Sequence, residues 1–493
     1  MTRTRTRVFL TGAAGNWGRR ILDEFRERSD SFDVIALVLP TARDIASIRE
    51  YEDMKNLEVV FGDMTDFNTV ERCVAGADFI LHVGAAVSPA VDDQPGLATR
   101  VNVGSMDAII RAVKAQPDPS QIGVVGIGSV AEMGDRNPPH HWGRVGDPLR
   151  VAVFDEYGQS KIIAEKALVE SGLPKWVWLR QTGIFHPGVL EIRDPIMTHS
   201  PFAGVMEWAS VEDSARLLAN ICEAAVPAEF WGEVYNIGGG DEWRLTNWDL
   251  QMRISGALGV KDVRRWYDRN WFATQNLHGL WYSDSDRLHE LVPFRQDTVT
   301  AALNRAVAAN PSLRLAGIIP PAIVKNLIMK PLTVKPRGTM AYVRDGDRVG
   351  IDAFFGSKES WESIGSWDTF WPPRPSRSPR LLELGWDESK SPDTWTASDY
   401  ADAADFRGGR LISEEVPIGA SRTPVEWRCA FGHIFTATPR LTLSAGHWCP
   451  ECVRDASGYT EQAKRNSFLA QVEVADAARS GRDGQGASRA GVA

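Results

Sequence analysis

The sequence predicts an α/β fold built on a doubly wound parallel sheet. Short apolar runs rich in β-branched residues alternate with helix-length polar segments through the first part of the chain. Strands that are apolar along their whole length must be covered on both faces, as in parallel sheets flanked by helices. The predicted strands lie at residues 8–12, 33–39, 57–63, 78–84, 122–128, 176–185 and 233–239.

Length, composition and charge set the general class. A chain of 493 residues is too long for one ordinary hydrophobic core, so we expect two or three domains. Its 43% hydrophobic and 24% charged residues are typical of a soluble globular protein. The net charge of −9 disfavours nucleic acid as a partner, because such proteins usually present a basic surface.

Cysteine usage and apolar stretches predict a cytoplasmic location. Two of the five cysteines are scattered and three are clustered, unlike a secreted disulfide scaffold, and the basic N-terminus lacks a long apolar run. No transmembrane segment is expected. The most apolar stretch, 315–334, is interrupted by Pro320, Pro321, Lys325 and Lys330. It predicts a core or docking helix pair, and contact with a membrane surface stays open.

The stretch TGAAGNWG (11–18) follows the first predicted strand and opens a helix over about 18–28. Gly12 permits a tight turn, Gly15 lets the backbone approach a diphosphate, and Gly18 allows close packing of helix on strand. Free N–H groups at the positive end of the helix would bind the diphosphate. The loop therefore predicts a dinucleotide site; a glycine-rich turn without a ligand is the alternative.

The order and spacing of further motifs resemble the extended short-chain dehydrogenase/reductase family, which includes nucleotide-sugar epimerases and dihydroflavonol-type reductases. The matching stretches are GDMTD (62–66), LHVGAAVSP (81–89), VNVGS (101–105), GSVAEMG (128–134), YGQSK (157–161), SVEDSA (210–215) and VYNIGGG (234–240). The resemblance covers roughly residues 1–300. It implies a Rossmann-type NAD(P)-binding domain with a small substrate subdomain at about 185–300.

The resemblance also implies the residues that hold NAD or NADP. These are Gly12, Gly15, Asn16, Trp17, Gly18, Asp63, Met64, Gly84, Ala85, Asn102, Tyr157 and Lys161. The choice between the two cofactors stays open, because Val38 and Leu39 at the end of the second strand offer neither an acid for a ribose hydroxyl nor a base for a phosphate.

Tyr157 and Lys161 are the candidate catalytic pair. Their separation of four residues places them on one face of a helix. A lysine ammonium there would stabilise tyrosinate and lower a phenol pKa that is about 10 unperturbed, so that Tyr157 could exchange a proton with a substrate oxygen. The resemblance implies that Ser129 hydrogen-bonds the same oxygen and that Lys161 also holds the nicotinamide ribose. An ordinary surface helix is the alternative.

Departures from the family narrow the expected reaction. Sugar-nucleotide dehydratases of the family carry an Asp-Glu pair directly after the Ser/Thr, where this chain has Val130 and Ala131. Nucleotide-sugar enzymes usually carry an arginine before the SVED segment, where this chain has MEWA (206–209). The presumed substrate region also contains aromatic and neutral residues, namely His140, His141, Trp142, Phe185, His186 and Trp208.

These observations favour an NAD(P)-dependent oxidoreductase that interconverts an alcohol and a ketone or aldehyde on an apolar or aromatic small molecule. One alternative is an epimerase that oxidises and re-reduces with tightly bound NAD. Another is a non-catalytic dinucleotide-binding scaffold or sensor. A homodimer is possible.

The C-terminal part predicts an additional zinc-containing region. Cys429, His433, Cys449 and Cys452 form two short ligand pairs separated by a loop, which suits four-coordinate zinc and resembles a zinc ribbon at 411–460. A structural staple or interaction module is expected; reduced cysteines in a small core are the alternative. Residues 301–410 are rich in Trp and Pro and have no assignable fold. Residues 461–493 are expected to form a helix and a disordered tail.

Overall fold

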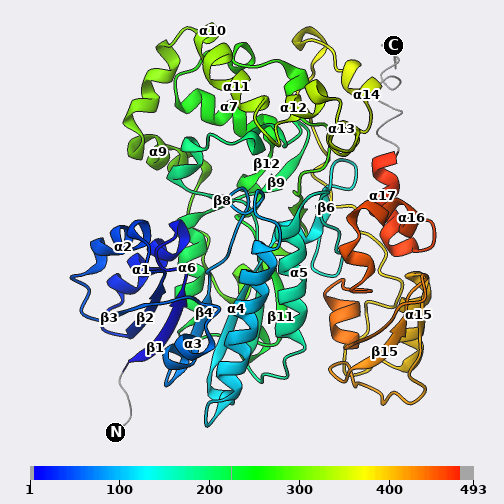
Figure 1. The fold of residues 1–493 in the computed structure, drawn as a ribbon. Helices are drawn as coiled ribbons and strands as arrows, with labels where there is room; N and C mark the ends of the chain where they lie inside the picture. The colour runs from blue at the N-terminus through cyan, green and yellow to red at the C-terminus, as the bar shows by residue number, and fades with distance from the viewer. Residues whose placement is uncertain (1–4, 224, 478–493) are drawn as a thin grey trace, which may run out of the picture.

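The computed structural model describes residues 5–223 and 225–477 (Figure 1). The predicted disordered tail therefore lies largely outside the described residues. The last described helices are α16 (Tyr459–Ala463) and α17 (Ser467–Ala477).

Seven parallel strands form the central sheet in the order β11-β7-β5-β4-β1-β2-β3, which confirms the predicted fold class. The strands are β1 (Thr6–Thr11), β2 (Phe32–Val38), β3 (Leu57–Phe61), β4 (Phe79–His82), β5 (Gly123–Ser129), β7 (Trp176–Gln181) and β11 (Glu233–Ile237). The strand order reverses between β1 and β4. At such a switch point the connections leave the sheet in opposite directions and open a crevice at the carboxyl ends of the strands.

Helices cover both faces of this sheet, as the apolar strands require. They are α1 (Asn16–Glu27), α2 (Ala42–Ile48), α3 (Phe67–Val74), α4 (Leu97–Lys114), α5 (Glu156–Val169) and α6 (Val211–Ile221). One hydrophobic cluster joins α1 and α6 to the sheet through residues such as Ile21 and Leu218. The cluster on the other face joins α3, α4 and α5 through Val70, Ile109 and Leu168.

A second lobe lies above the sheet in Figure 1. It contains short strands, β8 (Ile184–Phe185), β9 (Val205–Glu207), β10 (Ala209–Ser210), β12 (Arg244–Thr246) and β13 (Trp281–Tyr282), the last paired with β6 (Trp142–Gly143). Its helices include α7 (Asn247–Ala257), α8 (Ser285–Leu291), α9 (Val299–Ala309), α10 (Pro321–Ile323), α11 (Lys330–Thr333), α12 (Thr339–Asp345), α13 (Arg348–Phe355) and α14 (Lys358–Glu362).

Residues 299–370, most of them in the region without a predicted fold, complete this lobe. Val299 and Leu303 of α9 pack with Phe185 and Leu250 in one hydrophobic cluster. Trp367 packs in a second cluster with residues of the predicted substrate subdomain. The lobe therefore extends well beyond residue 300, because its apolar surface is buried only when the later helices are present.

The C-terminal module contains α15 (Ala397–Phe406) and a three-stranded antiparallel sheet of β14 (Arg410–Leu411), β15 (Val425–Arg428) and β16 (Ile434–Ala437). Trp395 and Tyr400 are buried against Trp427, so the core of the module begins before residue 411. The chain then returns to the N-terminal domain, where Tyr459 and Leu469 pack in one cluster with residues of the loops after β5.

Within the part of the chain that the structure describes, no single helix has the length and apolarity to cross a membrane. One helix pair, Pro311–Ile318 and Pro321–Thr333, meets both criteria when taken together, but it bends by 112° at the intervening prolines.

Candidate functional site

The glycine loop forms a tight turn between β1 and α1. Gly12 has φ +73°, and a Cβ there would lie 2.7 Å from the backbone of Gly84 after β4, so only glycine fits. A Cβ on Gly18 would lie 2.1 Å from the carbonyl oxygen of Gly12. These contacts agree with the predicted roles of Gly12 in the turn and Gly18 in close packing of helix on strand.

The first turn of α1 suits an anionic ligand. Its N-cap residue, Gly15, provides no side-chain cap, and there is no acidic residue in the turn. The N–H groups of Asn16 and its neighbours therefore remain available at the positive end of the helix. Trp17 is only 8% exposed and packs in the core, which leaves its backbone N–H as the group that can face a diphosphate.

Other predicted cofactor residues gather at the same edge of the sheet. Met64 Sδ would lie 2.7 Å from a Cβ on Gly84. Asn102 accepts a hydrogen bond from the N–H of Ala86 (2.8 Å) and donates one to Ser160 of α5 (2.9 Å), which ties the loop after β4 to that helix. Asp63 accepts hydrogen bonds from the backbone N–H and the hydroxyl of Thr65, both at 2.8 Å.

Replacing Gly15 by Asp should abolish dinucleotide binding while leaving the fold intact. Gly15 has an ordinary extended backbone, and a Cβ would contact only the Gly12 carbonyl at 3.2 Å, so the carboxylate acts through its charge beside the diphosphate. We expect at least a hundredfold loss of affinity by calorimetry, on the order of 3 kcal/mol. Gly15→Ala is the uncharged control and should lose far less; equal losses would contradict the assignment.

Ser129, Tyr157 and Lys161 converge where β5 ends and α5 begins. Asp155 caps α5 by accepting a hydrogen bond from the N–H of Gly158 (2.8 Å). Lys161 Nζ donates to the carbonyl of Ile127 (2.8 Å) and lies 5.8 Å from the centroid of the Tyr157 ring. The Ser129 side chain hydrogen-bonds the Tyr157 phenol. The three residues therefore lie close together in the structure, although they are up to 32 residues apart in the sequence.

The electrostatics of this cluster differ from the sequence-based expectation. Burial raises the pKa of Tyr157, and the hydrogen bond with Ser129 only partly opposes it. Burial also lowers the pKa of Lys161 to about 8, and the nearby Glu132, which acts to raise this pKa, only partly offsets the effect of burial. Because the Lys161 ammonium is directed at the Ile127 carbonyl, the predicted lowering of the phenol pKa is wrong for this geometry. Tyr157 is a neutral phenol near neutral pH, ready to donate a proton.

A network of buried charged side chains, which the sequence did not predict, contacts the elements that carry the Ser-Tyr-Lys cluster. Arg180 of β7 is fully buried and donates to both oxygens of Glu165 on α5, at 2.6 and 2.9 Å. Glu132 accepts a hydrogen bond from the N–H of Ser129 (2.7 Å) and lies 3.3 Å from Arg180. From the C-terminal module, Nε2 of His447 lies 2.9 Å from Glu165. The network links the module to both the serine loop and α5.

The two acids of this network differ in ionisation. Burial and the neighbouring Glu165 raise the pKa of Glu132 well above its usual range. Burial also disfavours the ionised form of Glu165, but the charge of Arg180 and the contact with His447 outweigh it and hold the Glu165 pKa below its usual range. The carboxyl group of Glu132 is thus occupied by its contacts with Ser129 and Arg180 and is not available as a catalytic acid.

Replacing Arg180 by Met should lower the free energy of unfolding by about 3–5 kcal/mol, because it leaves the buried Glu165 carboxylate without its guanidinium partner. Denaturant unfolding would measure this loss. Arg305→Met is a matched control: Arg305 pairs with Glu212 at 3.0 Å but is 41% exposed, so its loss should cost less than about 1 kcal/mol. Similar losses in the free energy of unfolding for both variants would show that the buried network stabilises the fold no more than an exposed ion pair does.

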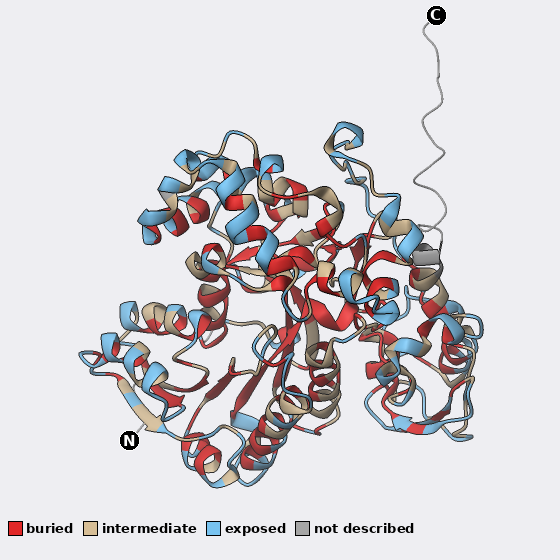
Figure 2. Cartoon of the chain, turned by 45° about the horizontal axis from the view of Figure 1, so that its top comes forward, coloured by how far each residue is buried: buried red, intermediate tan, exposed pale blue. Residues whose placement is uncertain are grey.

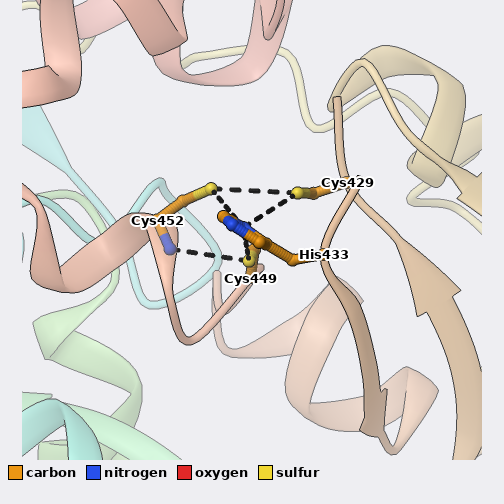
Figure 3. A group of neighbouring side chains, drawn as sticks. All are labelled: Cys429, His433, Cys449 and Cys452. Atoms are coloured by element: carbon orange, nitrogen blue, oxygen red, sulfur yellow. Dashed lines mark hydrogen bonds between the residues drawn. The ribbon is translucent and has the colours of Figure 1, made fainter. Parts of the chain in front are cut away.

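The four predicted metal ligands form a compact cluster in the C-terminal module (Figure 3). Nδ1 of His433 lies 3.4, 3.4 and 3.5 Å from the sulfurs of Cys429, Cys449 and Cys452, and the sulfurs of Cys429 and Cys452 lie 3.8 Å apart. Tetrahedral zinc with ordinary bond lengths separates its ligands by about 3.5 Å for N and S and about 3.8 Å for two S atoms. The cluster therefore has the size and donor set of a structural zinc site.

A largely apolar cavity of about 450 Å³ opens within the second lobe. Trp208, Met206, Leu250, Leu277 and Met329 are among its lining residues. Of the aromatic and histidine residues predicted for the substrate region, Trp208 lies here. His141 and Trp142 instead hydrogen-bond the carbonyl of Ser376, at 2.8 and 3.0 Å.

The cavity approaches the elements that carry the Ser-Tyr-Lys cluster at three points. Gly183 lies two residues after Gln181, which pairs with Ser129 in the sheet. Gly279 donates a backbone hydrogen bond to Gly134, directly after the serine loop (3.2 Å). His278 lies 3.5 Å from Asp155, the residue that caps α5. These contacts place one end of the cavity beside the serine loop and the start of α5.

Comparisons with known proteins concern the N-terminal part of the chain. Residues 12–207 match the family model described as NAD(P)H-binding, which agrees with the predicted dinucleotide-binding site and with the parallel sheet of the N-terminal part. An uncharacterized epimerase/dehydratase of Staphylococcus epidermidis is 28% identical over 127 residues, 24% of this chain and 38% of that protein. The low-salt glycan biosynthesis protein Agl12 of Haloferax volcanii is 25% identical over 276 residues, 51% of this chain and 82% of that protein.

Solved structures give more distant likenesses. A dTDP-glucose 4,6-dehydratase from Bacillus anthracis in complex with NAD aligns with a TM-score of 0.49 at 18% identity, covering 62% of this chain and 97% of that one. A UDP-glucose 4-epimerase from Bifidobacterium longum in complex with NAD+ and UDP gives 0.45 at 16% identity, covering 62% and 99%.

Proposed function

We propose that the protein is an NAD(P)-dependent oxidoreductase that interconverts an alcohol and a ketone or aldehyde on an apolar or aromatic small molecule. The observation that carries this proposal is that a largely apolar cavity lies next to the loops that hold the Ser129, Tyr157 and Lys161 cluster. A dinucleotide bound at the α1 loop would supply the hydride.

The chain's own residues would handle the proton and the orientation of the substrate. Ser129 would hydrogen-bond the substrate oxygen, and Tyr157, as a neutral phenol, would donate a proton to that oxygen during reduction. Lys161, held by the Ile127 carbonyl, lies between β5 and the start of α5, where its charge would favour a developing negative charge. The apolar walls around Leu250 and Leu277 would exclude water from the reacting centre.

The cofactor affinity should fall as the pH rises through about 8. The lowered pKa of Lys161 means that its ammonium is charged below this pH and neutral above it, so a contact with the cofactor ribose loses its charge. Tyr157 does not contribute to this step because burial raises its pKa. In Lys161→Met the step should disappear and both affinity and turnover should be low; a pH-dependent affinity in this variant would exclude Lys161 as its source.

An epimerase with tightly bound NAD is the second candidate. The similarity to the uncharacterized epimerase/dehydratase of Staphylococcus epidermidis supports it, and the match spans only part of that protein. Dehydration is less well supported, because Val130 and Ala131 are buried apolar residues and Glu132 is engaged in the charge network.

Turnover of externally added cofactor distinguishes the two candidates. Purified protein would be given NADH or NADPH together with a panel of apolar and aromatic ketones and aldehydes, and nicotinamide absorbance would be followed. The proposal predicts continuous, substrate-dependent consumption. A protein that retains NAD through purification and converts a substrate without consuming added cofactor would instead be an epimerase, and one that binds cofactor without any turnover would be a scaffold or sensor.

A further inference from the structure

The segment 311–333 presents an apolar outer face at the edge of the second lobe. Leu315, Ile318, Ile323 and Leu327 are 56%, 77%, 46% and 72% exposed, which is unusual for four large apolar side chains in one short segment. Figure 1 places α10, within this segment, at the outer edge of the lobe, and Figure 2 shows exposed positions along the helices there.

The inner face of the same segment is also apolar. Leu313, Ile319, Val324 and Met329 line the cavity, and Val324 and Met329 are almost fully buried. The helix pair is thus apolar on both sides and forms a thin wall between the cavity and the outside. Only one of these two apolar sides faces a core.

Charge distinguishes between possible occupants of the outer face. Residues 311–335 contain four basic residues and no acidic one, in a chain of net charge −9. Lys330 and Lys335 are exposed, and Lys325 is paired with Asp268 (2.6 Å). Two copies of this chain docked through this face would bring their basic groups together, whereas an anionic lipid surface complements them and accepts the apolar side chains between them.

We propose that the outer face of residues 311–333 docks on an anionic lipid bilayer, with Leu315, Ile318, Ile323 and Leu327 inserted at the level of the headgroups. The 112° bend between its two helices suits a segment lying in the interface plane. A consequence, which rests on the proposed function, is that the cavity behind this wall receives its apolar substrate from the membrane. The docking itself requires neither cofactor nor substrate.

Vesicle co-sedimentation of the full chain tests the docking. We expect binding to vesicles of phosphatidylglycerol and phosphatidylcholine, and weaker binding to phosphatidylcholine alone or at high salt. Ile318→Ser with Leu327→Ser should weaken binding on the order of 100-fold, because two large side chains lose their burial in lipid. Ile418→Ser with Val349→Ser is the matched control: these residues are 73% and 62% exposed elsewhere and should leave binding unchanged.

Three results would overturn the proposal. They are absence of binding to anionic vesicles, equal binding by the Ile318/Leu327 variant, and a lipid-free wild-type dimer that the same variant converts to a monomer without any vesicle binding. The last would assign the face to a second copy of the chain. Circular dichroism checks folding, and Leu315→Ser with Ile323→Ser repeats the test at independent positions. Because no turnover is measured, a failure of the proposed redox function would not affect the result.

Discussion

Replacing Tyr157 by Phe should lower the turnover number by a factor of about 10²–10⁴, or roughly 3–5 kcal/mol of barrier, while binding of the dinucleotide stays nearly unchanged. The change removes only the phenol that hydrogen-bonds Ser129, and the ring keeps its packing at the start of α5. Steady-state kinetics on a substrate of the wild type, with calorimetric cofactor binding alongside, would measure both quantities.

Two companion variants make this test specific. Ser129→Ala should cost less, on the order of 10²-fold, because it removes one oriented hydrogen bond to the reacting oxygen. Tyr235→Phe is a control for removing a phenol: Tyr235 is buried in β11 and belongs to the hydrophobic cluster on the α1 face of the sheet. Its turnover should match the wild type. If the Tyr157→Phe enzyme kept more than about a tenth of the wild-type rate, Tyr157 would not be the catalytic acid, and YGQSK would be an ordinary helix start.

Removing zinc should unfold the C-terminal module. Four protein ligands at these distances leave no open coordination position, so the binding energy of the metal contributes directly to folding, by about 10–16 kcal/mol in zinc-finger peptides. Elemental analysis should find about one zinc per chain. Cys449→Ser, or a strong chelator, should release it and open residues 397–477 to limited proteolysis.

Cys73→Ser is the control for the metal site, since Cys73 is a buried cysteine of α3 far from the cluster in the fold. It should retain the metal. A metal-free protein that resists proteolysis at the module would refute the zinc assignment. The hydride step should largely persist without zinc, because the residues proposed for it lie in the N-terminal domain; a strict zinc requirement for that step would contradict this division of roles.

Local patterns made much of the site predictable. Gly12, Gly18 and the Tyr157–Lys161 spacing are constraints of one turn and one helix; the structure shows the tight glycine turn and brings Lys161 Nζ within 5.8 Å of the Tyr157 ring centroid. The Cys429–His433 and Cys449–Cys452 pairs are equally local, so only one loop had to close to bring all four together. In each case the chemistry requires particular residue types at a fixed short separation.

The remaining features depend on contacts that are distant in sequence. Glu165 and His447 are 282 residues apart, and neither has a local pattern that indicates the other. The region after residue 300 had no assignable fold because it packs on residues that are distant in sequence: Trp367 packs on Phe202 and Trp248. The pKa of Tyr157 follows from burial and from the direction of the Lys161 side chain, which spacing alone does not determine.

Transfer of isotope from the cofactor tests the central claim most directly. NADH or NADPH carrying deuterium at the reactive nicotinamide carbon would be incubated with the enzyme and a ketone substrate, and the alcohol product analysed by mass spectrometry. We expect the deuterium to appear on the carbinol carbon of the product, and we expect Tyr157→Phe to slow this transfer without changing its destination. A product whose new carbon-bound hydrogen comes from solvent, or a substrate that is converted while the added cofactor keeps its deuterium, would contradict this mechanism.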